Sequence, residues 1–362
     1  MQNLNKPVYY GDYLELNKLL DTQKPKSKEV GNEAHDETLF IIVHQVYELW
    51  FKQILHELHS LDKIFNDTAV EESHLSTVVS RLERIKKIQG ILLEQLDVME
   101  TMTPMDFLEF RDLLVPASGF QSVQFREIEI LLGLKTNQRK EVDRQYFLGR
   151  LNNEDANRLM EMEKGETLFS RIESWLERMP FSKSDDFDFW GEYQSVVDDM
   201  LSGDEITILD NKATLPKNAR DAQIANLKST RETFETLFDE EKYNELKDKG
   251  ERRLSQRATL HALFILLYRD KPIFHLPFMV LNSLMDIDEG FTTWRYRHAL
   301  MAHRMLGTKI GTGGSSGHQY LKSAAENNRS FLDLFNLSTF LIPRSKLPEL
   351  PSSLNDIMNF KY

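Results

Sequence analysis

The feature that most constrains this fold is the spacing of apolar residues between Asp36 and about Phe65. Apolar side chains recur there every three or four positions, which places them on one face of an α-helix. The residues of this stripe are Leu39, Ile42, Val43, Val46, Leu49, Trp50, Ile54 and Leu58. Most of a helix's stability in a folded protein comes from packing such a face, so the stripe predicts that other helices lie against it.

The same period continues through most of the chain. A second long pattern runs from about Val70 to Met102. Thr103 and Pro104 are a cap and a first-turn residue for another helix, which Pro116 ends. Further helices are predicted at about 119–134, 153–163, 166–179, 186–202, 217–248, 252–270, 277–307 and 318–335. No convincing alternation of apolar and polar residues indicates strands, so the predicted fold class is all-α.

The domain organisation follows from where the helical pattern is interrupted. A chain of 362 residues could form two domains on length alone. The polar stretches 180–186 and 203–217 are short, however, and each is flanked by helices that need partners. We therefore expect a large single-domain helical bundle over residues 1–362, with a small helical insertion at about 135–215.

Composition excludes several classes of function. The chain contains no cysteine, which removes disulfides, iron–sulfur clusters, zinc thiolates and thiolate-ligated haem. A net charge of −12 argues against a nucleic-acid partner. No stretch approaches the length of a membrane-spanning helix, and the first residues lack a secretory signal pattern. We therefore expect a cytoplasmic protein without a membrane partner, in which histidine or carboxylate side chains would bind any metal.

A glycine-rich segment, GTKIGTGGSSGHQYL, runs from Gly307 to Leu321. It is not a phosphate-binding P-loop, because Gly317 is followed by His318 and Gln319 instead of Lys and Ser or Thr. A predicted helix precedes it, which excludes the strand-first dinucleotide fingerprint. Taken alone, these residues favour equally a surface hinge and a loop that wraps around a ligand.

The ten histidines are the first candidates for chemistry. His56 and His59 stand three residues apart in HELH, one residue short of the spacing that a zinc-protease motif requires. Their acidic neighbours are more typical of a solvated helix face. We therefore do not predict a metal site at this pair.

Two other histidines lie in apolar stripes. His44 shares a helix face with the aromatic Phe40, one turn earlier. His298 lies on a stripe with Trp294, and His303 also has apolar neighbours. Each could be a buried core residue or a functional one, and periodicity alone does not distinguish His298 from His303.

Phe107 and Arg111 lie one turn apart, so an aromatic ring and a guanidinium point the same way. Arginine in such a place suits a substrate carboxylate, which it binds by charged, bidentate hydrogen bonds. The alternative is an ordinary ion pair with one of the 57 acidic residues. The residues by themselves thus predict an aromatic pocket that bears histidine and arginine, without naming a reaction.

Four segments together resemble the tryptophan 2,3-dioxygenase family. They are HDETLFIIVHQVYELWFKQ, PASGFQSVQFRE, WRYRHALMAHRMLG and GTGGSSG, and they occur in the family's order. The resemblance extends over nearly the whole chain, from residues 9–20 to 333–344. It implies an all-α enzyme built around a b-type haem (heme b), one per subunit, and assembled as a homotetramer.

The resemblance also assigns roles to matched positions. It places the axial haem ligand on His298 in preference to His303, and the distal histidine on His44. It places substrate contacts on Phe40, Phe107, Arg111, Ser118 and Thr312, where Ser118 also contacts a haem propionate. Some members have tyrosine at the position of Phe107. Tyr10 and Tyr13 match aromatic residues that enter a neighbouring subunit's pocket, so residues 1–30 are expected to dock there.

The implied reaction inserts both atoms of dioxygen across the indole C2–C3 bond of L-tryptophan and gives N-formylkynurenine. In this interpretation the segment 311–317 folds over the substrate, with glycine permitting close backbone approach. The alternatives are a related haem mono-oxygenase that acts on an indole substrate and a helical haem carrier or sensor. The sequence does not decide whether His44 removes a proton or only accepts a hydrogen bond.

Overall fold

The computed structural model describes residues 7–67, 70–134, 149, 151–180, 183–184, 187–211, 214–307, 321–322 and 325–359. Within these ranges the chain is helical, and the all-α prediction is confirmed. The strands among the described residues are two short antiparallel ones, β1 (Lys183–Ser184) and β2 (Phe187–Asp188).

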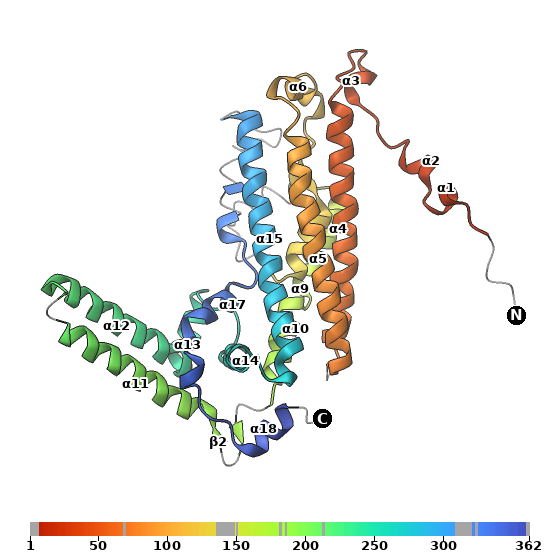
Figure 1. Ribbon diagram of the computed structural model, residues 1–362. Helices are drawn as coiled ribbons and strands as arrows, with labels where there is room; N and C mark the ends of the chain where they lie inside the picture. Colours follow the sequence, from red (N-terminus) through yellow and green to blue (C-terminus); the bar gives the residue numbers. More distant parts are fainter. Residues whose placement is uncertain are drawn as a thin grey trace, which may run out of the picture.

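Three long helices form the centre of the molecule and run side by side: α4 (Glu37–Phe65), α5 (Glu72–Met99) and α15 (His275–Leu306) (Figure 1). Their apolar faces meet in one large core, although Ile42 and Leu49 of the stripe predicted for α4 are exposed, at 43% and 50%. The helices α5 and α15 approach closely because Gly290 has no side chain. The Gln89 side chain occupies the space thus left and donates from Nε2 to the carbonyl of Ile287 at 2.8 Å.

Shorter elements cover this core. Between α5 and α15 along the chain lie α6 (Pro104–Leu108), η1 (Arg111–Leu114), η2 (Gly119–Gln121), α7 (Val123–Leu131), α9 (Asn153–Lys164), α10 (Leu168–Glu177), α11 (Phe189–Asp210), α12 (Lys217–Phe238), α13 (Glu240–Asp248), α14 (Gln256–Leu267) and η4 (Pro272–Phe274). After α15 come α17 (Leu332–Asn336), η5 (Leu337–Phe340), η6 (Arg344–Lys346) and α18 (Ser352–Met358). The predicted start at Thr103 is confirmed, because its hydroxyl accepts the N–H of Asp106 in a capping box.

Several predicted boundaries differ from the observed ones. The helix that starts at Pro104 ends at Leu108, well before Pro116, and residues 328–331, within the helix predicted at 318–335, are not helical. Two other differences have a local explanation. The helix α11 extends to Asp210, through part of the polar stretch expected to be irregular, because Ile208 faces Leu227 across the groove between α11 and α12. The predicted helix 217–248 is divided at Asp239, whose side chain accepts the N–H of Lys242 and so caps α13. The helices α11 and α12 form a hairpin that projects from the body (Figure 1).

The expected insertion at about 135–215 is described only from residue 149 onward. Within it, α10 packs against α4 and α14, whereas α11 packs mainly against α12. Its standing as a separate unit, and that of the chain as one domain, remain predictions.

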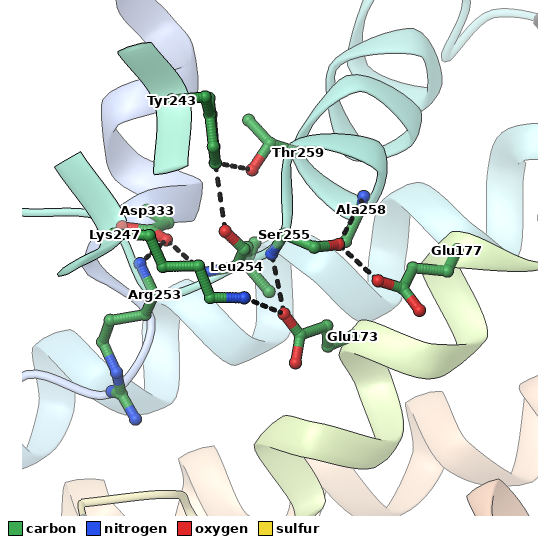
Figure 2. Close-up of polar contacts among 10 residues, drawn as sticks. All are labelled: Glu173, Glu177, Tyr243, Lys247, Arg253, Leu254, Ser255, Ala258, Thr259 and Asp333. Atoms are coloured by element: carbon green, nitrogen blue, oxygen red, sulfur yellow. Dashed lines mark hydrogen bonds and ion pairs between the residues drawn. The ribbon is translucent and has the colours of Figure 1, made fainter. Parts of the chain in front are cut away.

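A buried polar network joins α10, α13, α14 and α17 (Figure 2). Ser255 caps α14 and donates its backbone N–H to Glu173 Oε1 at 2.7 Å. The buried carboxylate of Asp333 accepts the N–H groups of Arg253 at 2.6 Å and Leu254 at 2.7 Å. This network fixes α17, which lies against α15.

The N-terminal residues form an arm that extends away from the long helices (Figure 1). It contains α1 (Tyr10–Tyr13), α2 (Leu16–Leu19) and α3 (Lys26–Glu29). The carboxylate of Glu37 accepts the N–H groups of Lys26 at 2.7 Å and Ser27 at 2.8 Å, and so ties α3 to the body. Beyond that anchor, Tyr10 is 71% exposed and Tyr13 is 75% exposed. Among the described residues, no helix has the length and apolar character needed to cross a membrane.

Candidate active site

A cavity of about 270 Å³ lies between α4, α5, α15 and the segment that leads from α6 into α7. This volume is close to the lower end of the range of small-molecule sites, about 300–1,000 Å³. Six of the residues singled out from the sequence line it: Phe40, His44, Phe107, Arg111, Ser118 and His298. Phe40 and His298 are more than 250 positions apart in the chain, and the packing of α15 on α4 and α5 brings the six residues together.

The α4 wall of the cavity carries His44. Its Nδ1 lies 2.7 Å from the carbonyl oxygen of Phe40, which can only accept, so Nδ1 carries the proton of the neutral ring. Nε2 is then left as an acceptor. His44 is exposed at the cavity surface, but the protein atoms around it lower its pKa below the usual range, against the opposing effects of the Phe40 carbonyl and the Glu48 carboxylate. His44 is therefore neutral at pH 7.

Aromatic rings form the adjoining wall. The centroids of Phe40 and Phe107 are 5.6 Å apart in a stacked arrangement, and Phe110 lies 5.4 Å from Phe107 with its ring nearly perpendicular. Such pairs favour a fixed geometry as well as burial. The wall therefore offers a flat, apolar surface to a planar ligand.

Two polar groups border this aromatic wall. Arg111 begins η1, and its side chain is 15% exposed; its Nη1 lies 3.4 Å from Oδ1 of Asp112, a carboxylate that is itself 88% exposed. Ser118 precedes η2, where its hydroxyl accepts the N–H of Phe120 and its own N–H donates to Gln121. Both residues line the same cavity as the aromatic wall.

The α15 wall carries His298. Its ring packs against that of Trp294, with centroids 5.3 Å apart. Burial lowers the pKa of His298 to about 4, so the imidazole is neutral. Its Nδ1 is buried and has no hydrogen-bond partner among the described residues. His303 is exposed and does not line the cavity, and the exposed positions of His56 and His59 agree with the predicted solvated face.

The sequence reasoning missed a buried charged cluster on the same cavity wall. Glu129 accepts a hydrogen bond from Arg126 Nη1 at 2.6 Å and another from Arg295 Nη2 at 2.8 Å. Arg295 Nη1 also donates to the carbonyl of Asn328 at 2.9 Å. The three-residue spacing of Arg126 and Glu129 was visible, but nothing in the sequence pairs α7 with α15.

The predictions for Thr312, Tyr10 and Tyr13 have different outcomes. Thr312 and the segment 311–317 lie outside the described residues. Tyr10 and Tyr13 lie on the exposed arm and do not line the cavity of their own chain.

Comparison with known proteins identifies the family of this chain. The model of the family described as tryptophan 2,3-dioxygenase matches residues 2–341. The chain belongs to the tryptophan 2,3-dioxygenase family. It is 51% identical to the tryptophan 2,3-dioxygenase of Alteromonas mediterranea over 355 residues, which cover 98% of each chain. It is 50% identical to that of Bdellovibrio bacteriovorus, over 98% of this chain and 99% of the relative. It is 45% identical to that of Mus musculus, over 95% of this chain and 84% of the relative.

Tryptophan 2,3-dioxygenases are haem-dependent, and the described residues fit a haem. A neutral imidazole is the form of histidine that binds iron, and His298 is held in that form beside a largely apolar cavity. The buried Nδ1 of His298 and Nε of Arg295 both lack partners among the described residues. Buried polar atoms without a hydrogen-bond partner are uncommon in folded proteins. Their position at one cavity supports a bound polar group there.

Proposed function

We propose that this protein catalyses the insertion of both atoms of dioxygen across the C2–C3 bond of L-tryptophan, giving N-formylkynurenine. The proposal rests on one observation: two neutral histidines, an arginine and an aromatic wall line the same cavity. His298 would hold the haem, one b-type group per subunit, and Ser118 would contact a propionate. Bound haem iron supplies the binding and activation of dioxygen.

The residues of the chain orient the substrate. Arg111 binds the carboxylate, because a guanidinium matches a carboxylate in charge and in its paired donors. Ser118 and Thr312 bind the amino-acid end. Phe40 and Phe107 contact one side of the indole ring. Fixing the indole in one pose removes orientational freedom before reaction, which lowers the barrier.

His44 sets the rotation of the indole in this pose. Its Nδ1–H is committed to the carbonyl of Phe40, so Nε2 is the atom that faces a ligand as an acceptor. The indole N–H is the donor on that edge of tryptophan. Because the pKa of His44 is lowered, the ring stays neutral and keeps this acceptor available at pH 7. The role of His44 in the proposal is therefore to accept a hydrogen bond.

A homotetramer is part of the proposal. The arm carries three exposed tyrosines, including Tyr9 at 75%. Exposed aromatic residues in a row are costly in water unless a surface covers them. Residues 1–30 would dock on a neighbouring subunit and place Tyr10 at that subunit's cavity. A cytoplasmic location is proposed with it, in keeping with the lack of cysteine.

The substrate assignment is tested by Arg111→Leu, assayed with L-tryptophan and with an indole analogue that lacks the carboxylate. A charged hydrogen bond contributes about 1.5–3 kcal/mol, so kcat/KM for L-tryptophan should fall about 10- to 150-fold. The loss should be much smaller for the analogue, which never made the contact. Arg297→Leu, which removes an exposed ion pair with Asp97, is the control. Equal losses for both substrates would remove Arg111 from this role.

A further inference from the structure

We propose that Arg295 is a positioning residue for His298. In this proposal Arg295 holds α15 against α7 and against the segment at Asn328, and so fixes the place of the imidazole. The inference rests on the proposed function, because it assigns His298 to iron. It concerns residues for which the family resemblance gave no role.

The contacts of Arg295 join three separate parts of the cavity wall. Its side chain is 5% exposed, and the carboxylate of Glu129 that it meets is 2% exposed. Nη2 donates to Glu129 on α7 at 2.8 Å, and Nη1 donates to the carbonyl of Asn328 at 2.9 Å. The other oxygen of Glu129 is taken by Arg126. A buried pair with both carboxylate oxygens bonded tolerates little displacement, since separating its members leaves buried charges uncompensated.

Arg295 lies close enough to His298 on α15 for its contacts to fix the position of the histidine. Arg295 precedes His298 by three residues, which places the two side chains about 60° apart around one turn of helix. On the other side of α15, Arg297 pairs with Asp97 of α5 at 2.7 Å. Two turns earlier, on the Arg295 side, Asp288 accepts the N–H of Ser330 at 2.7 Å. The Arg297–Asp97 pair is exposed, at 40% and 68%, and contributes little, whereas Arg295 and Glu129 are buried. The turn that carries His298 is therefore held mainly from the Arg295 side.

His298 needs such support because its ring is not held by a hydrogen bond within the described residues. Histidines that bind metals usually donate their second N–H to a carboxylate, carbonyl or water, which orients the ring. Nδ1 of His298 has no such partner there, and its ring packs against that of Trp294. The orientation of the imidazole then depends on the place of its helix. Loosening Arg295 should change the bond from iron to histidine.

The experiment uses the full-length, haem-loaded, ferrous protein. It compares wild type with Arg295→Gln, Arg295→Lys and Glu129→Gln, and Arg297→Gln on the same helix is the matched control. The readouts are the iron–histidine stretching band in the resonance Raman spectrum and the reduction potential of the iron. We expect a shifted or broadened band and a changed potential in Arg295→Gln and Glu129→Gln. Arg295→Lys should lie between them and wild type, and Arg297→Gln should match wild type.

The outcomes separate this inference from the proposed function. A wild-type protein that shows no iron–histidine band would refute the assignment of His298 to iron, and with it both proposals. Wild-type bands and potentials in Arg295→Gln and Glu129→Gln would overturn the positioning role alone. A lower melting temperature with an unchanged band would mean that Arg295 acts only on stability, which also overturns it. If Arg295→Gln does not fold, Glu129→Gln decides, because it keeps the shape of the side chain and removes its charge.

Discussion

Replacing Gly290 by alanine should destabilise the protein, although alanine is normally the better helix residue. A methyl group at position 290 would lie 2.6 Å from Oε1 of Gln89 and 2.8 Å from its Cδ, closer than real contacts allow. Gln89 is 4% exposed, so other residues enclose its side chain. To make room it must give up its bond to the carbonyl of Ile287 or push α5 away from α15.

The size of the effect follows from two opposing contributions. Alanine gains about 1 kcal/mol over glycine inside a helix. Leaving a buried amide unsatisfied costs about 1–3 kcal/mol, and overpacking a tight interface costs about 1–3 kcal/mol. Because Gln89 either loses its bond or forces the helices apart, one of these costs applies and the helix gain offsets about 1 kcal/mol of it. We therefore expect Gly290→Ala to lower the free energy of unfolding by up to about 2 kcal/mol. The haem content should fall as well, since α15 carries His298.

Urea unfolding at one fixed protein concentration measures this difference. Gly90→Ala is the control: position 90 is exposed on α5, next to Gln89, and a methyl group there meets nothing within 4 Å. It should raise stability by about 0.5–1 kcal/mol. Gln89→Ala combined with Gly290→Ala should lose less than the sum of the two single changes, because the clash is gone. A Gly290→Ala protein as stable as Gly90→Ala would refute this account of the α5–α15 contact.

Three further outcomes are expected. Burial lowers the pKa of His261, whose Nδ1 lies 2.7 Å from the carbonyl of Leu176. The unfolded chain therefore binds the proton first, and the free energy of unfolding should fall as pH drops below about 6.5. When it is measured by urea unfolding between pH 7.5 and 5, this free energy should change less with pH in His261→Asn than in wild type. An equal change in both proteins would exclude this histidine as the cause. Deleting residues 1–14 should weaken both catalysis and self-association in sedimentation and turnover assays, whereas a fully active monomer would contradict the shared-site proposal. His298→Ala should lose the haem Soret band or activity and His303→Ala should keep both, so the reverse result would show that the ligand is misassigned.

The long helices were predictable because each leaves a signal within its own stretch of sequence. The apolar stripe from Leu39 to Leu58 fits α4, and Thr103 fits the start of α6. The division at Asp239 was missed because the apolar period continues through it, and the end of α11 was missed because it depends on contact with α12. Local pattern cannot show a partner that is distant in the chain.

The candidate site was predictable in part for the same reason. Phe40 and His44 share one helix face, and the aromatic character of that face was visible in the sequence. The choice of His298 over His303 needed the family resemblance, and only the packing of α15 shows that His298 alone of the two lines the cavity. The cluster of Arg126, Glu129 and Arg295 leaves no local signal, because its charges meet across helices α7 and α15.

The most direct test of the proposed function is the isotopic composition of the product. The haem-loaded, reduced protein is mixed with L-tryptophan under dioxygen labelled in both atoms, and the product is analysed by mass spectrometry. The account predicts N-formylkynurenine that carries two labelled oxygen atoms, with no consumption of an added electron donor. A product with a single labelled atom and an intact indole ring would identify a mono-oxygenase and contradict the account, and the absence of turnover would contradict it as well.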